Sequence, residues 1–134
     1  MDRSDTIPLM GATVEAGFSG VADEFIEDHL DLNRYLISHQ AATFFIRVSG
    51  NSMVGAGIFP KDLLVVDRSL DPQEKDIVIA VIDGEFTLKR FRTIDGVIHL
   101  CPENPQFPAI RITSDQLEFA IWGVVTSVVR KLKP

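Results

Sequence analysis

Two short segments of the chain contain residue types that could cut a peptide bond. Residues 49–53 (SGNSM) are typical of a turn, and residues 85–90 (EFTLKR) are typical of a strand. A serine hydroxyl attacks a carbonyl group efficiently only when a neighbouring group accepts its proton. A lysine can accept that proton only when its own ammonium form is destabilised. Ser52 and Lys89 are therefore a candidate nucleophile and a candidate base.

Each segment also has an ordinary structural interpretation. Gly-Asn-Ser is common in turns, and a lysine on a strand is most often a solvated surface residue. On a strand over residues 85–92 the side chains alternate between two faces, so Lys89 shares a face with Thr87 and Phe91. From these residues alone, a structural turn and a surface lysine are the favoured interpretations.

The elements that must position these two residues are predicted to be strands. From Thr43 onward, short runs rich in Val, Ile and Phe alternate with turn residues, as is typical of a mainly β domain. Asp-Gly at 83–84 and at 95–96 favours the positive φ angles of tight hairpins, which predicts a three-stranded meander. Strands are expected near residues 44–48, 63–67, 76–82, 85–92, 97–101 and 119–130.

Two of these runs, 77–82 and 122–125, are apolar on both faces. A strand of this kind must be covered on both sides, and one covering surface could be a second subunit.

The sequence before these strands predicts little regular structure. Pro8, Gly11, Gly17 and Gly20 disfavour any regular element in the first twenty residues. The stretch 23–37 allows one or two short helical turns. We therefore expect residues 1–40 to form a flexible N-terminal arm and residues 41–134 to form the folded domain.

Composition limits the functions that the chain can have. A length of 134 residues, 46% of them hydrophobic, fits one compact domain. The net charge of −6 opposes tight binding to a phosphate backbone, so direct specific DNA binding is not expected. The single cysteine and the absence of a long apolar run lead us to expect a cytoplasmic protein without a membrane anchor. We expect no cofactor. We also expect no metal, because no cysteine or histidine spacing suits a metal site.

The chain resembles the LexA/UmuD/MucA family of self-cleaving serine peptidases, the peptidase S24-like group, and above all its UmuD-type members. The resemblance extends from about Ile7 to Lys131. It implies a peptidase domain of several antiparallel strands in a strongly curved, partly barrel-like arrangement with little helix. The matching segments are 31–33, 49–53, 57–58, 61–67, 76–78, 83–89 and 123–125.

The resemblance also implies a role for individual residues. Ser52 would be the nucleophile and Lys89 the general base. The self-cleavage bond would be Ala16–Gly17, with alanine where UmuD itself has cysteine and where LexA and MucA have alanine. The residues expected to support the turn and the oxyanion hole are Gly50, Asn51 and Met53.

As a member of this family, the chain would be cut when a RecA filament on single-stranded DNA stimulates it during the SOS response. The product would act as a homodimer and as the accessory subunit of a UmuC-like Y-family polymerase in translesion synthesis. The main alternative is the core of a LexA-like or phage-repressor-like regulator without its DNA-binding domain. A signal peptidase would need a membrane anchor, and an interaction protein with an inactive site would have lost Ser52 or Lys89. The peptidase interpretation is therefore favoured.

Overall fold

The computed structural model describes residues 5–11, 26–116 and 118–133 of the chain. The chain divides into two compact units, Met1–Ser38 and His39–Pro134, and each unit has its own sheet. Within the described residues, no helix is long and apolar enough to cross a membrane.

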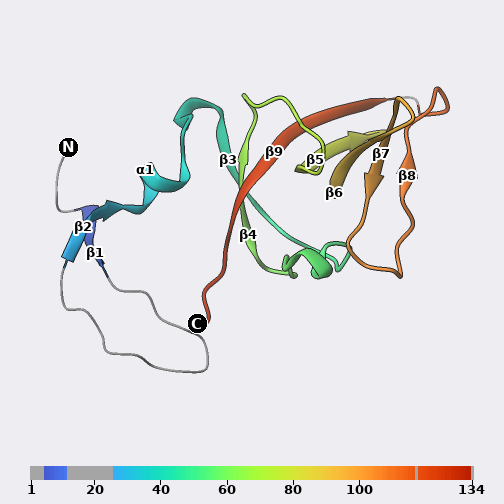
Figure 1. Cartoon of the computed structure of the whole chain (residues 1–134). Helices are drawn as coiled ribbons and strands as arrows, with labels where there is room; N and C mark the ends of the chain where they lie inside the picture. Colours follow the sequence, from blue (N-terminus) through green and yellow to red (C-terminus); the bar gives the residue numbers. More distant parts are fainter. Residues whose placement is uncertain (1–4, 12–25, 117, 134) are drawn as a thin grey trace. The chain divides into compact units, whose positions relative to one another are not determined.

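The larger unit is built on one open sheet of seven antiparallel strands, in the order β3-β4-β9-β5-β6-β7-β8 (Figure 1). The prediction of a mainly β fold with antiparallel strands and little helix is confirmed. The sheet is not a closed barrel, because β3 and β8 lie at its two edges. The strands are β3 (Thr43–Arg47), β4 (Leu63–Asp67), β5 (Ile77–Ile82), β6 (Glu85–Ile94), β7 (Val97–Cys101), β8 (Ile110–Arg111) and β9 (Phe119–Val129).

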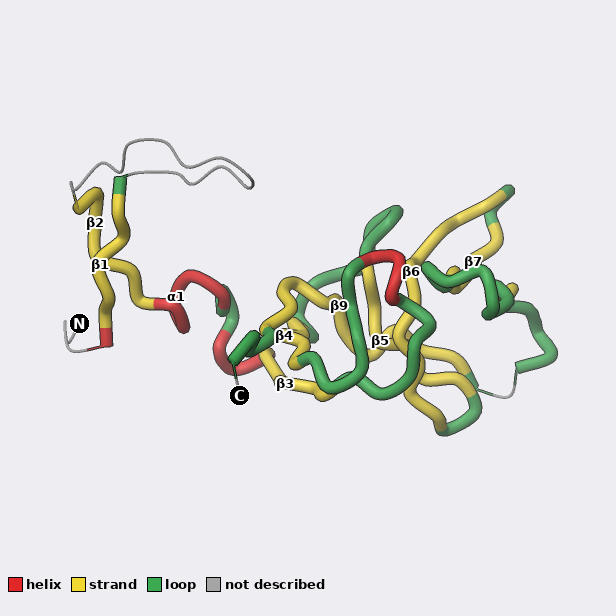
Figure 2. The backbone as a smooth tube through the Cα atoms, turned by 90° about the horizontal axis from the view of Figure 1, so that it is seen from below, coloured by secondary structure: helices red, strands yellow, loops and turns green. Residues whose placement is uncertain are grey.

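Strands and loops make up nearly all of this unit in Figure 2. The helical segments among its described residues are two short 3₁₀ turns, Gln40–Ala42 and Val54–Ala56. Both predicted Asp-Gly turns are present. Asp83 and Gly84 have φ angles of 49° and 85°, and Asp95 and Gly96 have φ angles of 51° and 77°. They join β5, β6 and β7 into the expected meander.

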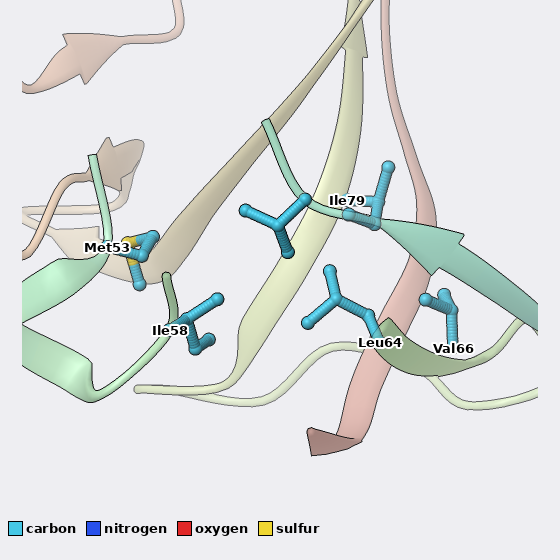
Figure 3. Close-up of a cluster of buried hydrophobic side chains, with 6 residues drawn as sticks. Met53, Ile58, Leu64, Val66 and Ile79 are labelled. Carbon is cyan, nitrogen blue, oxygen red and sulfur yellow. The ribbon is translucent and has the colours of Figure 1, made fainter. Parts of the chain in front are cut away.

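Two clusters of buried hydrophobic side chains form the core of the larger unit. Strand β5 contributes to both clusters, because its side chains alternate between the two faces of the sheet. The prediction that this strand is covered on both sides is confirmed. The buried members of the first cluster (Figure 3) are Val48, Met53, Ile58, Leu64, Val66 and Ile79. The buried members of the second are Val78, Ala80, Phe91, Leu100 and Val124.

The smaller unit contains a two-stranded antiparallel sheet of β1 (Thr6–Met10) and β2 (Ile26–Asp31), followed by helix α1 (Leu32–Leu36). The predicted helical turn is therefore present, and the Asp31 side chain caps it by accepting from the Arg34 N–H. The prediction of no regular element in the first twenty residues is wrong for Thr6–Met10. Proline is found on edge strands, and both strands of this two-stranded sheet are edge strands.

Candidate active site

Ser52 lies in the loop between β3 and β4, between an exposed turn and a buried anchor. Gly50 has a φ of +84°, a backbone conformation that favours glycine, and it lets the chain turn sharply before Ser52. Asn51 is exposed, whereas the Met53 side chain is only 1% exposed and belongs to the first core cluster. Ser52 itself is partly buried. The core thus holds one side of the turn while the serine stays near the surface.

Lys89 lies on β6 and is only 8% exposed, so the surface-lysine interpretation is excluded. Its Nζ lies 3.3 Å from Ser52 Oγ. The same Nζ donates to Thr87 Oγ1 at 2.9 Å and to the Leu88 carbonyl at 3.2 Å. The Ser52 hydroxyl is also 3.3 Å from the Leu88 carbonyl oxygen. The structure therefore brings Ser52 and Lys89 into direct contact from two separate elements.

The surroundings of Lys89 disfavour its charge. Within the described residues, no carboxylate lies within ion-pair distance of its Nζ. Burial lowers the pKa of Lys89, because the ammonium form loses hydration without gaining a counterion. A neutral amine has two N–H groups and one lone pair. If Thr87 Oγ1 and the Leu88 carbonyl take the two N–H groups, the lone pair is left for the Ser52 hydroxyl.

The turn also presents unused backbone donors. Among the described residues, no acceptor is found for the N–H groups of Asn51, Ser52 and Met53. Free N–H groups beside a nucleophile can stabilise the negative oxygen that develops during acyl transfer. The predicted supporting residues thus differ in what they provide: Gly50 permits the turn, and Met53 anchors it.

Two further residues at this turn were not singled out from the sequence. The Glu103 N–H donates to the Ser52 carbonyl at 2.8 Å, and Asn104 Nδ2 donates to the Asn51 carbonyl at 2.9 Å. Both lie in the loop between β7 and β8. The run of turn formers at 102–105 predicts a loop, but no local signal shows that this loop contacts a turn some fifty residues earlier.

A small pocket adjoins the site. It has a volume of about 100 Å³ and lies between residues of β3 and β6. A larger pocket of about 490 Å³ includes Arg47 and Arg130 but neither Ser52 nor Lys89, so its size does not connect it with this chemistry. The residues that line the small pocket are Ile46, Arg47, Val48, Ser49, Leu64, Ile79, Phe86, Thr87 and Leu88.

Some predicted features are not placed by the structure. Ala16 and Gly17, the expected cleavage bond, lie outside the described residues. Across ranges 5–11, 26–116 and 118–133, no group of three or more His, Cys, Asp or Glu side chains is arranged to hold a metal ion.

An antiparallel β domain that carries a serine beside a buried lysine is the arrangement expected of a serine hydrolase with an amine base. Comparison with known proteins independently identifies a peptidase family. Residues 8–126 match the family described as Peptidase S24-like, and the chain belongs to that family.

The chain is similar to several proteins over most of their length. The chain is 46% identical to Protein ImpA of Salmonella typhimurium, over 98% of this chain and 89% of that protein. It is 41% identical to Protein MucA of Escherichia coli, over 92% of this chain and 84% of that protein. It is also 39% identical to LexA repressor 2 of Geobacter sulfurreducens, over 95% of this chain but only 61% of the repressor.

Proposed function

We propose that the protein is a self-cleaving serine peptidase of the SOS response that cuts its own Ala16–Gly17 bond when a RecA filament stimulates it. The observation that carries this proposal is the 3.3 Å contact between Ser52 Oγ and Lys89 Nζ, on a lysine that is only 8% exposed. Membership of the Peptidase S24-like family supports the same reaction class.

In the first half of the reaction, Ser52 Oγ attacks the carbonyl carbon of Ala16. Neutral Lys89 accepts the hydroxyl proton and becomes an ammonium ion. The bond from the Ala16 carbonyl carbon to the Gly17 nitrogen then breaks, and Lys89 returns its proton to the departing amine. In the second half, Lys89 takes a proton from water, whose oxygen attacks the ester carbon. The bond from that carbon to Ser52 Oγ then breaks, Lys89 returns its proton to Ser52 Oγ, and the Ala16 carboxylate is released.

The Ser52 hydroxyl has two competing acceptors, and this competition links activity to the charge of Lys89. While Lys89 is protonated, its ammonium group has no lone pair, so the hydroxyl is left to donate to the Leu88 carbonyl, 3.3 Å away. Loss of the ammonium proton creates the acceptor that turns the hydroxyl into a nucleophile. The cutting rate should therefore rise with pH as the fraction of neutral Lys89 rises.

The free N–H groups of Ser52 and Met53 would form the oxyanion hole for the Ala16 carbonyl oxygen. Gly17 has no side chain to obstruct close approach of the backbone to Ser52, and Ala16 has a small one. Val14 would occupy the small pocket beside the site, whose volume of about 100 Å³ suits a short aliphatic side chain.

A bond tethered to its own peptidase has a high effective concentration, so the intact protein needs a brake. A mostly protonated Lys89 supplies one part. Burial lowers the pKa of Lys89, but only those molecules in which its amine is neutral can cut. A rarely populated cleavable pose of residues 14–17 would supply the rest. The RecA filament would favour that pose without contributing catalytic groups.

The processed protein, beginning at Gly17, would act as a homodimer and as the accessory subunit of a UmuC-like Y-family polymerase. The polymerase partnership rests on the family resemblance. The dimer has additional support from aromatic side chains available for a contact, since Phe45 is 57% exposed and Phe86 is 59% exposed.

A second candidate function is the core of a LexA-like regulator, which the 39% identity to LexA repressor 2 supports. The two candidates share the cleavage reaction and differ in what cleavage controls. Binding of the intact protein to operator DNA would favour the regulator. Co-purification of the Gly17 product with a Y-family polymerase would favour the accessory subunit.

The central experiment identifies the amino-terminal residue of the product formed with RecA, single-stranded DNA and a nucleotide. We expect Gly17. The variants Ser52→Ala and Lys89→Ala should each stop cutting while the protein stays folded. Matched controls are Ser114→Ala and Lys131→Ala, which alter exposed residues of the same types and should cut normally. Normal cutting by Lys89→Ala would overturn the assignment of the base.

A further inference from the structure

We propose that Asn104 and Glu103 are positioning residues for the nucleophile turn, residues 49–53. They orient the N–H groups of Ser52 and Met53, which form the proposed oxyanion hole, and they keep Ser52 in contact with Lys89. This inference rests on the proposed function, because it assigns a task to groups around Ser52. It concerns the loop between β7 and β8, which carries both residues.

The loop holds the turn on both sides of the nucleophile. The Glu103 N–H donates to the Ser52 carbonyl at 2.8 Å, and the Glu103 carbonyl accepts from the Gly55 N–H at 2.7 Å. Asn104 Nδ2 donates to the Asn51 carbonyl at 2.9 Å. The orientation of the Asn104 amide is itself fixed, since its Oδ1 accepts from the Gln106 N–H at 3.0 Å.

The two bound carbonyl groups are those that determine where the free N–H groups point. The Asn51 carbonyl shares a peptide plane with the Ser52 N–H, and the Ser52 carbonyl shares the next plane with the Met53 N–H. In a trans peptide the C=O and N–H bonds point in opposite directions, and no peptide bond among the described residues is cis. By holding these carbonyls, Asn104 and Glu103 direct both N–H groups away from the loop, free to bind a substrate oxygen.

Close packing at Gly55 shows how tightly the loop and the turn fit together. A Cβ atom at this position would lie 2.5 Å from the Glu103 carbonyl oxygen. Real Cβ atoms do not approach an oxygen so closely, so any larger residue would push the loop away from the turn. Glycine at position 55 therefore permits the short hydrogen bond between its N–H and Glu103.

The same loop is tied to the strand that carries the base. Arg90 follows Lys89 on β6, and its Nε donates to Glu103 Oε1 at 2.6 Å. Its Nη1 donates to the Lys75 carbonyl, also at 2.6 Å. The loop between β7 and β8 therefore contacts both the turn that carries Ser52 and the strand that carries Lys89. Because this ion pair is partly exposed, its loss should alter placement more than stability.

The test measures self-cleavage of the full chain at alkaline pH without RecA, across a pH series, together with urea unfolding of each variant. Asn104→Ala removes the donor to Asn51. It should lower the limiting rate by roughly 10-fold or more, because loss of one oxyanion donor costs about 100-fold to 1,000-fold. The midpoint of the pH profile should not move, because Lys89 and its neighbours are unchanged.

Two other variants sharpen the test. Asn104→Asp keeps the acceptor for the Gln106 N–H but lacks the donor, and it should also slow cutting about 10-fold or more. Glu103→Gln weakens the pair with Arg90 and should slow cutting by a few-fold. Its matched control is Glu74→Gln, because Glu74 Oε1 accepts from Arg92 Nε at 2.6 Å on the same strand, away from the turn. The control should cut normally.

The outcomes separate the two proposals. Continued cutting by Ser52→Ala or Lys89→Ala would overturn the proposed function itself. If those variants are inactive but both Asn104 variants cut as fast as Glu74→Gln, the positioning role is wrong. A slower rate explained entirely by loss of folded protein, or a shifted midpoint in Asn104→Ala, would equally contradict it.

Discussion

Asp62 and Lys89 are both buried in the larger unit, and their surroundings have opposite effects on their charge. Asp62 is 2% exposed and accepts from Arg130 Nε at 2.6 Å and from the Phe59 N–H at 2.8 Å. The Arg130 hydrogen bond lowers the pKa of Asp62 despite its burial. Lys89 is 8% exposed, its hydrogen-bond partners among the described residues are all neutral oxygens, and burial lowers its pKa.

The contrast indicates what each site is for. Where this fold buries a charge to hold its structure, it supplies an opposite charge and backbone donors. Leaving Lys89 without a counterion brings its neutral form nearer to physiological pH, which a proton acceptor needs and a structural residue does not. The local environment of the lysine is therefore evidence for chemistry at this site.

The largest expected effect comes from giving Lys89 a counterion of its own, as Asp62 has in Arg130. Thr87→Asp would place a carboxylate close to Nζ, because Thr87 Oγ1 now lies 2.9 Å from it. A nearby opposite charge shifts a pKa by about 1 to 3 units, here upward, so cutting at neutral pH should slow by about 10-fold to 1,000-fold. The pH–rate profile should move to higher pH.

Thr87→Asn is the matched control for this change, since it has nearly the same shape without the charge. It should cut within a few-fold of the original protein. Equal neutral-pH rates for Thr87→Asp and Thr87→Asn would show that the charge of Lys89 does not control the reaction.

The next largest effect concerns stability. Asp62→Asn removes the charge that pairs with Arg130, and it should lower the free energy of unfolding by about 2 to 3 kcal/mol. The loss is less than for a fully buried pair because Arg130 is partly exposed. Urea unfolding at neutral pH measures it. Glu74→Gln breaks an exposed pair with Arg92 and should lower the free energy of unfolding far less than Asp62→Asn does.

The stabilisation by Asp62 should depend on pH with a definite sign. Its pKa is lower in the folded protein than in the unfolded chain, so its contribution is present above the unfolded carboxyl pKa and is lost as pH falls through the folded value. The difference in stability between the original protein and Asp62→Asn should therefore shrink below about pH 4. A difference that grows on acidification would contradict the assigned pairing.

The smallest effect has the opposite sign. Lys89→Met replaces an amine that burial penalises, and it should raise the free energy of unfolding at neutral pH by about 1 kcal/mol. Between the lowered folded pKa and the ordinary lysine value the unfolded chain binds more protons, so the original protein gains stability as pH rises. The advantage of Lys89→Met should fall between pH 7 and about pH 10. Lys131→Met, at an exposed position, should show no such trend.

Much of the larger unit could be predicted from the sequence because its signals are local. Strands β4 and β7 occupy the predicted residues, and the ends of β3, β5, β6 and β9 differ by one or two residues. Alternation along β6 correctly placed Lys89 and Thr87 on one face, as their hydrogen bond requires. Asp-Gly turns have a strong backbone preference of their own and need no distant partner.

The features that could not be predicted from the sequence depend on contacts between residues far apart in the chain. The pairing of β1 with β2 overrode the expectation drawn from Pro8, and β8 has only two residues, too few for a visible pattern. The hydrogen bonds of Glu103 and Asn104 to the nucleophile turn are set by how the loop after β7 folds back. The burial of Lys89 depends on the packing of several strands at once, so its residue type alone gives no measure of it.

The division of single strands between two core clusters has a consequence for how the larger unit melts. Along β9, Val124 belongs to one cluster and the adjacent Val125 packs against the other. Along β5, Val78 and Ile79 are divided in the same way. Unfolding of either cluster would remove packing contacts from β5 and β9, and these strands also contribute side chains to the other cluster. The two clusters should consequently lose their order together, in a single cooperative transition.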